Sequence, residues 1–321
     1  MTCPGSPPIL IFGGALIGHA YNTTESVSEL LAALKSLGIR RIDTAARYPP
    51  TNPGNSERLL GQTGAAAQGF TIDTKFDFSG DGSGSLEPAA VDKSLNESYE
   101  RLALEKDVHV NVFYCHTPDP KTPLEAQAAG LDAQYKKGLF TQLGVSNFSP
   151  EMLSSFIEIC EREGFVKPTV YQGQYNLVCR GSEDTLFPML RRHGISINAY
   201  SPLAGGFLTG QLTAGTTEGT RFADGNLMGQ SFKAQYDKAE MHAAINDLGN
   251  IIRAQGISSI EASLRWVCFH SALHPEDGVI LGASSTAQLA QNVAWIEKGA
   301  LPEKVIAAMD VISRQVSGKG A

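Results

Sequence analysis

The sequence predicts an α/β protein folded as a single (β/α)8 TIM barrel that spans residues 1–321. The chain is longer than the roughly 250 residues that such a barrel needs. Short apolar runs rich in β-branched residues alternate with helical patterns, which favours a parallel sheet. The alternative is an open, doubly wound sheet, but its G-x-G-x-x-G fingerprint does not follow the first apolar run, Ile9-Leu10-Ile11-Phe12. These observations favour the closed barrel.

The predicted strands and helices alternate in chain order. We expect strands at 9–12, 39–43, 71–75, 108–114, 142–145, 169–172, 195–200 and 278–281. We expect helices at 25–37, near Ser56, at 91–102, at 123–137, from Ser149 onward, at 187–193, and as long helices running through Phe269. Ser149 before a proline is a typical helix start, whereas Gly38 and Gly194 are typical helix ends. The result is eight successive β/α units.

A long segment follows the seventh predicted strand. Residues 204–229 are rich in Gly and Thr, and they read as a loop longer than a simple connection requires. In a (β/α)8 barrel the active site lies at the C-terminal ends of the strands, where such loops gather. We therefore expect residues 204–229 to form a lid over a cofactor or substrate.

Composition restricts the function classes. With 42% hydrophobic and 18% charged residues, the chain is typical of a soluble globular protein. Its formal charge of −7 and the lack of a Lys/Arg block argue against nucleic-acid binding. No signal peptide or membrane-spanning run is apparent, so we expect a cytoplasmic protein without a membrane partner. The cysteines are dispersed, which favours free thiols over a metal site: Cys3, Cys115, Cys160, Cys179 and Cys268.

Four ionisable residues follow or end three successive predicted strands: Asp43 and then Tyr48, Lys75, and His116. Each residue alone has an ordinary structural explanation, as a turn, cap, core-edge or solvated side chain. Together at one barrel rim they suit carbonyl reduction, which needs a proton donor for the developing oxyanion. We expect Lys75 to lower the pKa of Tyr48, Asp43 to keep Lys75 charged, and His116 to orient the carbonyl.

The same residues resemble the aldo-keto reductase signature. The resemblance covers almost the whole chain and looks most like the aflatoxin-aldehyde reductase branch. The matching segments are 38–48, 56–61, Thr74-Lys75, His116, 144–148, Gln174-Tyr175-Asn176, 187–191, 200–210 and 281–285, followed by Gln288, Gln291 and Asn292. The resemblance implies a catalytic tetrad of Asp43, Tyr48, Lys75 and His116, and the cofactor NADPH.

The resemblance also implies the cofactor contacts. Ser146, Asn147 and Gln174 are expected to hold the nicotinamide carboxamide, and Tyr200 to stack on the ring. Ser284 and Gln288 mark a helix N-terminus suited to the 2′-phosphate, although no Lys or Arg stands there as in many relatives. The full expected set is Ser146, Asn147, Gln174, Tyr200, Ser201, Leu203, Gly205, Arg221, Gly282, Ser284, Gln288, Gln291 and Asn292. For Arg221, a clamp on the cofactor phosphates and a solvated loop cation are both open.

The sequence is compatible with three functions. The first is an NADPH-dependent reductase of small aldehydes or ketones, a monomer or homodimer, with aryl-aldehyde reduction or aryl-alcohol oxidation as an alternative substrate class. The second is an NADPH-binding regulatory or sensor subunit, similar to potassium-channel β subunits. The third is a metal-dependent barrel hydrolase, which is disfavoured because no His-x-His follows the first predicted strand.

Overall fold

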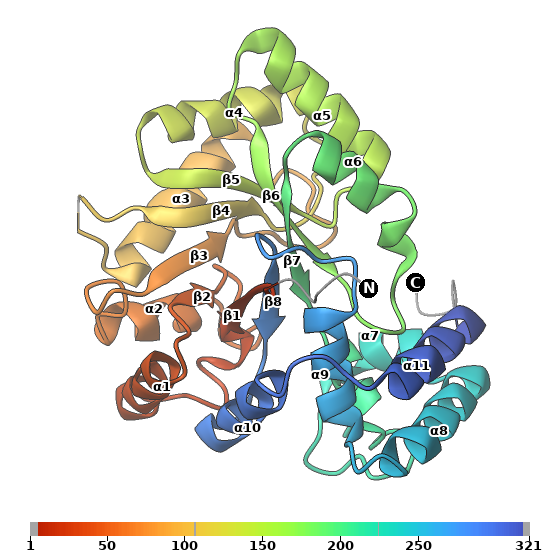
Figure 1. The fold of residues 1–321 in the computed structure, drawn as a ribbon. Helices are drawn as coiled ribbons and strands as arrows, with labels where there is room; N and C mark the ends of the chain where they lie inside the picture. Colours follow the sequence, from red (N-terminus) through yellow and green to blue (C-terminus); the bar gives the residue numbers. More distant parts are fainter. Residues whose placement is uncertain (1–5, 106, 224, 317–321) are drawn as a thin grey trace.

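A closed barrel of eight parallel strands forms the centre of the protein (Figure 1). The computed structural model describes residues 6–105, 107–223 and 225–316. The strands run around the barrel in chain order, and β8 closes the ring by pairing with β1. They are β1 Ile9–Gly13, β2 Arg41–Asp43, β3 Thr71–Lys75, β4 Val110–Cys115, β5 Phe140–Ser146, β6 Pro168–Gln174, β7 Ser196–Tyr200 and β8 Gly278–Leu281. The predicted (β/α)8 fold is confirmed.

Helices surround the barrel, as Figure 1 shows. They are α1 Thr24–Ser36, α2 Asn55–Gln62, α3 Pro88–Leu102, α4 Leu124–Lys136, α5 Pro150–Glu163, α6 Leu186–Arg192, α7 Leu227–Tyr236, α8 Ala239–Arg253, α9 Ser259–Phe269, α10 Thr286–Ile296 and α11 Glu303–Val316. Short 3-10 helices lie at Gly14–Leu16, Gly181–Glu183 and Ala204–Thr209. Ser149 caps α5 by accepting from the Met152 N–H at 3.2 Å, as the sequence indicated.

Two of the predicted strands begin two residues too early. The second was expected from Ile39, but the Ile39 N–H donates to Leu34 O at 2.9 Å while Gly38 adopts a φ of 72°. These residues therefore terminate α1 in a left-handed helix cap, which uses the backbone that a strand would need. The fourth strand was expected from Val108, whose N–H instead closes a turn onto Glu105 O at 2.9 Å.

The segment between β7 and β8 is more structured than the predicted loop 204–229. Its first residues form the 3-10 helix Ala204–Thr209, in which Gly205 and Gly206 have φ values of 67° and 107°. Its last residues begin α7, which Asn226 caps by accepting from the Gly229 N–H at 3.1 Å. The prediction of an unbroken loop was therefore wrong at both ends. Glycines with positive φ interrupt the first helix, and the second has weak hydrophobic periodicity, so neither gives a clear helical pattern in the sequence.

Bulky polar side chains fill the barrel interior. Tyr114 and Asn198 are buried and joined by a 2.7 Å hydrogen bond from Asn198 Nδ2 to the tyrosine hydroxyl. Glycines on adjacent strands make room for them. A Cβ on Gly144 would lie 2.3 Å from the Tyr114 ring, and one on Gly278 would lie 2.3 Å from Asn198 Oδ1. Since the interior is packed, the strands offer their C-terminal ends for binding.

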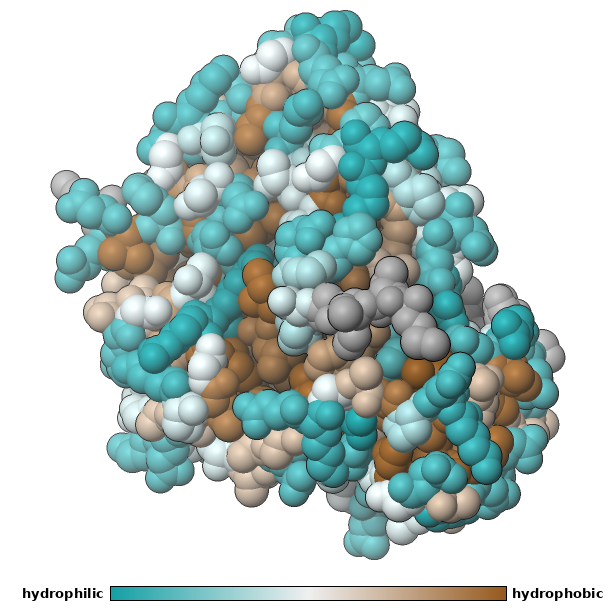
Figure 2. Space-filling view, viewed as in Figure 1, coloured by the Kyte–Doolittle hydropathy of each residue, from teal (hydrophilic) through white to brown (hydrophobic). Residues whose placement is uncertain are grey.

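The outer helices bury their apolar faces and expose polar ones. In Figure 2, hydrophilic residues cover most of the helices on this face, while apolar residues gather nearer the centre. Within the described residues, no helix has the length and apolar character that crossing a membrane requires. Cys115, Cys160, Cys179 and Cys268 are free thiols, as expected. Cys3 and the C-terminal segment 317–321 lie outside the described residues.

Candidate active site

Three oxygen atoms hold the Lys75 ammonium at the C-terminal end of the barrel. Lys75 ends β3, and Asp43 ends the neighbouring strand β2. Lys75 Nζ donates to both Asp43 carboxylate oxygens at 2.7 Å and to the Thr44 carbonyl oxygen at 2.8 Å. The three acceptors equal in number the three hydrogens of an ammonium. Lys75 and Asp43 are both buried, so each charge compensates the hydration that the other has lost.

Tyr48 and His116 lie beside this ion pair. Lys75 Nζ is 5.1 Å from the centroid of the Tyr48 ring. His116 directly follows β4, and its ring centroid is 5.8 Å from that of Tyr48, with the two planes at 86°. Phe78 makes a second edge-on contact with the His116 ring, at 5.0 Å between centroids. The structure thus brings together the four side chains that the sequence singled out.

Lys75 acts to lower the pKa of Tyr48, as expected, but the net pKa is not lowered. Burial raises the pKa of Tyr48 above its ordinary value of about 10. The Lys75 ammonium and the Arg221 guanidinium act in the lowering direction, while the Asp43 carboxylate raises the pKa. Since Asp43 offsets part of the effect of Lys75, burial prevails. For Lys75, burial acts to lower the pKa, but the Asp43 and Tyr48 charges outweigh it and the net pKa is raised.

His116 is a neutral imidazole at physiological pH. Burial, followed by the positive charges of Lys75 and Arg47, lowers the pKa of His116 to about 3. The His116 Nδ1 atom is buried without a hydrogen-bond partner in the described part of the chain. A neutral imidazole carries one N–H donor, so His116 can give a hydrogen bond without giving up a proton. These properties suit a group that orients a carbonyl oxygen.

The low pKa of His116 predicts a loss of stability in acid. An unfolded histidine titrates near pH 6.5, whereas folded His116 stays neutral until about pH 3, so the unfolded state binds the proton preferentially between these values. The free energy of unfolding should therefore fall as pH drops below about 6.5, by about 2 kcal/mol at pH 5 from this residue. Denaturant unfolding of the wild type and of His116→Gln at pH 8 and pH 5 measures the difference. Equal pH dependence of the two proteins would contradict the neutral, buried imidazole.

Gln172 is a member of the site that the sequence analysis missed. Its Nε2 atom donates to Asp43 Oδ1 at 2.7 Å, and the side chain is buried on β6. Gln174, the residue expected to bind the cofactor, donates to the Tyr236 hydroxyl at 2.6 Å and to Gln235 Oε1 at 3.1 Å. Thus Gln172 contacts the Lys75–Asp43 pair, and Gln174 contacts α7. Both glutamines stand in one short strand, so only the fold distinguishes them.

Asn147 links the C-terminal ends of β4, β5 and β7. It follows Ser146 with a φ of 63°, a left-handed conformation that asparagine tolerates better than most residues. Its Nδ2 atom donates to the His116 carbonyl oxygen and to Ser146 Oγ, each at 3.1 Å, and its Oδ1 atom accepts from the Tyr200 hydroxyl at 3.1 Å. Tyr200 ends β7 and remains partly exposed. Ser146, Asn147 and Tyr200 therefore lie around the same barrel end as His116.

Four residues expected to contact the cofactor follow β7: Ser201, Leu203, Gly205 and Arg221. Ser201 has a φ of 54°, and its carbonyl oxygen accepts from Asn176 Nδ2 at 3.0 Å. Leu203 precedes the 3-10 helix, and a Cβ on Gly205 would lie 2.6 Å from the Phe232 ring of α7. The Arg221 guanidinium lies 5.3 Å from the centroid of that ring and close enough to Tyr48 to influence its pKa. Arg221 is thus partly buried near the site, not a solvated loop cation.

The expected phosphate site lies at the start of α10. Gly282 follows β8, and the Ser284 N–H and hydroxyl both contact Gln288 Oε1, at 2.8 and 3.2 Å. Ser285 caps α10 by accepting from the Gln288 N–H at 3.2 Å. Gly282, Ser284, Gln288 and Gln291 are exposed, whereas Asn292 is buried. Polar donors and a helix N-terminus are therefore present, with no cation among these residues.

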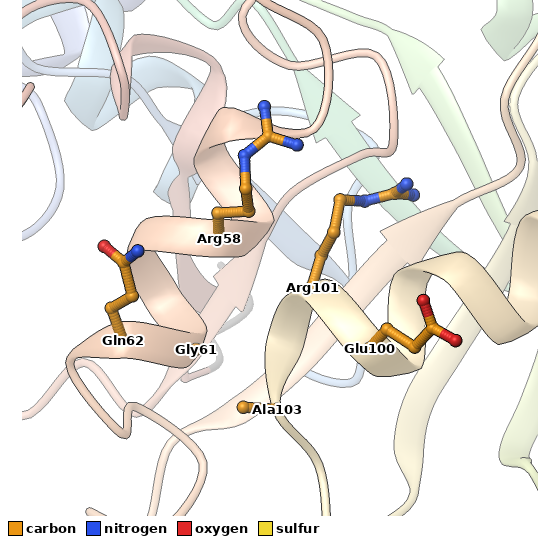
Figure 3. Close-up of a pocket in the computed structure, with 6 residues that line it drawn as sticks. All are labelled: Arg58, Gly61, Gln62, Glu100, Arg101 and Ala103. Atoms are coloured by element: carbon orange, nitrogen blue, oxygen red, sulfur yellow. The ribbon is translucent and has the colours of Figure 1, made fainter.

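A shallow pocket of about 340 Å³ lies elsewhere, between α2 and α3 (Figure 3). Its lining residues are Arg58, Gly61, Gln62, Glu100, Arg101 and Ala103. Arg58 donates to Pro53 O at 2.9 Å, and Arg101 donates to Glu57 Oε2 at 2.6 Å. Both cations thus have partners within the protein, and none of the four clustered side chains lines the pocket. We assign it no part in the chemistry.

Metal ligation is the remaining alternative from the sequence. Across residues 6–105, 107–223 and 225–316, no three His, Cys, Asp or Glu side chains are grouped so that they could hold a metal ion. The buried charges at the barrel end are an ammonium and a carboxylate that bond to each other.

The parallel eight-stranded barrel, with a buried lysine–aspartate pair and with a tyrosine and a histidine at its rim, gathers the proton donors and hydrogen-bond donors that chemistry at a carbonyl group requires. The comparison with known families agrees: the pattern described as "Aldo/keto reductase family" matches residues 9–314. This chain belongs to the aldo/keto reductase family.

Its relatives include several named reductases. Human aflatoxin B1 aldehyde reductase member 2 is 33% identical over 324 residues, covering 97% of this chain and 88% of the relative. An aldo-keto reductase of Pseudocercospora fijiensis is 33% identical over 288 residues, covering 88% and 95%. The oxidoreductase sirO of Leptosphaeria maculans is 32% identical over 314 residues, covering 94% and 93%. The predicted resemblance to the aflatoxin-aldehyde reductases is confirmed.

Proposed function

We propose that this protein reduces small aldehydes or ketones to alcohols with NADPH, using Tyr48 as the proton donor. The observation that carries the proposal is the Lys75 ammonium, bonded to Asp43 at 2.7 Å and 5.1 Å from the Tyr48 ring, with His116 on the same rim. These groups match the needs of a carbonyl oxygen that gains negative charge and then a proton. In this proposal the enzyme is cytoplasmic, acts as a monomer or homodimer, and uses residues 204–229 as its lid.

The residues around the rim fit a nicotinamide nucleotide. Asn147 and Ser146 offer an amide and a hydroxyl that match a carboxamide, and Tyr200 offers a partly exposed aromatic face. The N-terminus of α10 offers N–H groups for a phosphate, and Arg221, close enough to Tyr48 to influence its pKa, supplies a cation on the same side of the site as Tyr48. When bound, the reduced nicotinamide would supply the hydride that adds to the carbonyl carbon.

Tyr48 completes the reaction by donating its phenolic proton to the carbonyl oxygen. The Lys75 ammonium stabilises the phenolate that remains, and Asp43 keeps this ammonium charged despite its burial. His116, neutral at physiological pH, donates a hydrogen bond that orients the carbonyl oxygen. Burial that raises the pKa of Tyr48 keeps the phenol protonated, which is the form an acid needs.

A cofactor titration followed by a carbonyl panel tests this function. Quenching of protein fluorescence by NADPH and NADH gives the two affinities, and we expect the tighter binding for NADPH. Oxidation of NADPH with 4-nitrobenzaldehyde, succinic semialdehyde and an aryl ketone then reports turnover. Saturable oxidation supports the reductase. Tight binding of NADPH without turnover of any carbonyl would contradict it and favour a sensor subunit.

A further inference from the structure

The first turn of α2 contacts the backbone segments that carry three of the four clustered side chains. The Ser56 N–H donates to the Tyr48 carbonyl oxygen at 3.0 Å. Ser56 Oγ lies 2.8 Å from the hydroxyl of Thr44, the residue after Asp43. Ser56 thus joins the segments of Tyr48 and Asp43, while its own hydroxyl donates to Gly14 O at 3.1 Å.

Glu57 makes the corresponding contact with the third segment. The hydroxyl of Thr74, the residue before Lys75, donates to Glu57 Oε1 at 2.5 Å. Arg101, at the end of α3, donates to the other carboxylate oxygen, Oε2, at 2.6 Å and balances its charge. Figure 3 shows Arg101 extending from α3 beside α2. The Glu57 carboxylate therefore has a partner on each oxygen.

These contacts are fully buried. Thr44, Ser56, Glu57 and Thr74 have no exposed surface. Burying a carboxylate and three hydroxyls is costly unless all are hydrogen-bonded, and an apolar helix face would serve packing alone at a lower cost. The polar contacts instead fix backbone positions. Thr44 is the critical one, because its carbonyl oxygen is also the third acceptor of the Lys75 ammonium.

We propose that Ser56 and Glu57 are positioning residues for the reduction, which hold the segments of Asp43, Tyr48 and Lys75 in register and so set the distance from the Lys75 ammonium to the Tyr48 phenol. The inference rests on the proposed function. Neither side chain touches the reacting groups, so both act through Thr44, Thr74 and the Tyr48 backbone. A displacement of the order of 1 Å in such a group can cost about a hundredfold in rate.

Thr74→Val is the sharpest test, because it removes the hydroxyl that bonds Glu57 with little change in shape. It also leaves the Glu57–Arg101 pair intact, whereas Glu57→Ala would leave a buried arginine without its partner. We expect a fall of about tenfold in kcat with an unchanged KM for the carbonyl. Since Lys75 would then stabilise the phenolate less well, the high-pH limb of kcat should move to higher pH. Thr74→Ser, which restores the hydroxyl, should restore both.

Thr122→Val is the matched control. Thr122 is also buried, and its hydroxyl donates at 2.7 Å to the Asp119 carboxylate, which otherwise accepts from the N–H groups of Gly84, Leu86, Lys121 and Thr122. It should lower the melting temperature without moving the pH profile of kcat. If Thr74→Val only lowers the melting temperature and keeps the wild-type kcat and pH profile, the contacts are structural and the inference is overturned.

A second measurement separates this inference from the proposed function. The Tyr48 phenol can be titrated directly by NMR of 13C-labelled tyrosine in the protein without cofactor, with Tyr48→Phe to assign the signal. We expect a higher pKa of Tyr48 in Thr74→Val and in Ser56→Ala than in the wild type. An unchanged pKa in both variants would overturn the inference. Failure of the wild type to reduce any carbonyl would instead refute the proposed function and leave this titration meaningful.

Discussion

Replacing Tyr48 with phenylalanine should abolish carbonyl reduction while cofactor binding persists. The substitution removes only the hydroxyl and keeps the ring that contacts His116 at 5.8 Å between centroids. General-acid catalysis typically contributes about 10²- to 10⁴-fold to a rate, so we expect a loss of that size in kcat. Stopped-flow measurement of NADPH oxidation, with fluorescence titration of NADPH, reports the two quantities separately.

Tyr99→Phe provides the control for that prediction. The Tyr99 hydroxyl donates to the Leu139 carbonyl oxygen on the outer side of the protein, between α3 and the start of β5. Its loss should lower stability and leave kcat unchanged. A Tyr48→Phe protein that retains more than a tenth of the wild-type kcat would show that another group delivers the proton. The nearest candidate is His116, and the His116→Gln variant would then carry the larger loss.

Replacing Lys75 with methionine should remove both activity and much of the stability. Among the described residues, the substitution leaves the buried Asp43 carboxylate with Gln172 as its one side-chain hydrogen-bond donor, at 2.7 Å. Breaking a buried ion pair in this way typically costs about 3–5 kcal/mol. Adding Asp43→Asn removes the unpaired charge, so the double variant should be more stable than Lys75→Met alone. Both should remain inactive, since neither has an ammonium beside Tyr48.

Urea unfolding of the single and double variants measures this cycle. Lys137→Met is the matched control, because Lys137 pairs with Asp92 at 2.7 Å on the surface with both side chains about half exposed. Exposed pairs contribute little, so this variant should have the wild-type midpoint. Equal stability of Lys75→Met and the wild type would mean that Asp43 is not held as a buried carboxylate.

The order of the strands was predictable, because each is a short apolar run between helical patterns. Their exact starts were not, since Ile39 looks like strand but completes the cap of α1 through its bond to Leu34. Positions 43, 75 and 116 were predictable as neighbours because parallel strands bring their C-terminal ends to one rim. Their roles in catalysis remain predictions that the experiments above test.

Other features of the site depend on distances that a sequence pattern does not contain. Gln172 and Gln174 are two residues apart on β6, yet one bonds to Asp43 and the other to α7. The pKa of Tyr48 is a balance between burial, Lys75 and Asp43, and the sequence reveals only that the charges are present. The third acceptor of Lys75 is the Thr44 carbonyl oxygen. Because this is a backbone group, the residue type at position 44 does not reveal the contact.

The hydrogen-bonded ammonium of Lys75 also bears on whether this lysine could react with an aldehyde substrate. A free amine beside a reactive aldehyde condenses with it to an imine, which would block the enzyme. Lys75 keeps its proton because its pKa is raised, so its nitrogen has no lone pair available to attack, and Asp43 and Thr44 hold the ammonium by accepting hydrogen bonds from it. Borohydride treatment in the presence of excess aldehyde should therefore alkylate the surface lysines and spare this one.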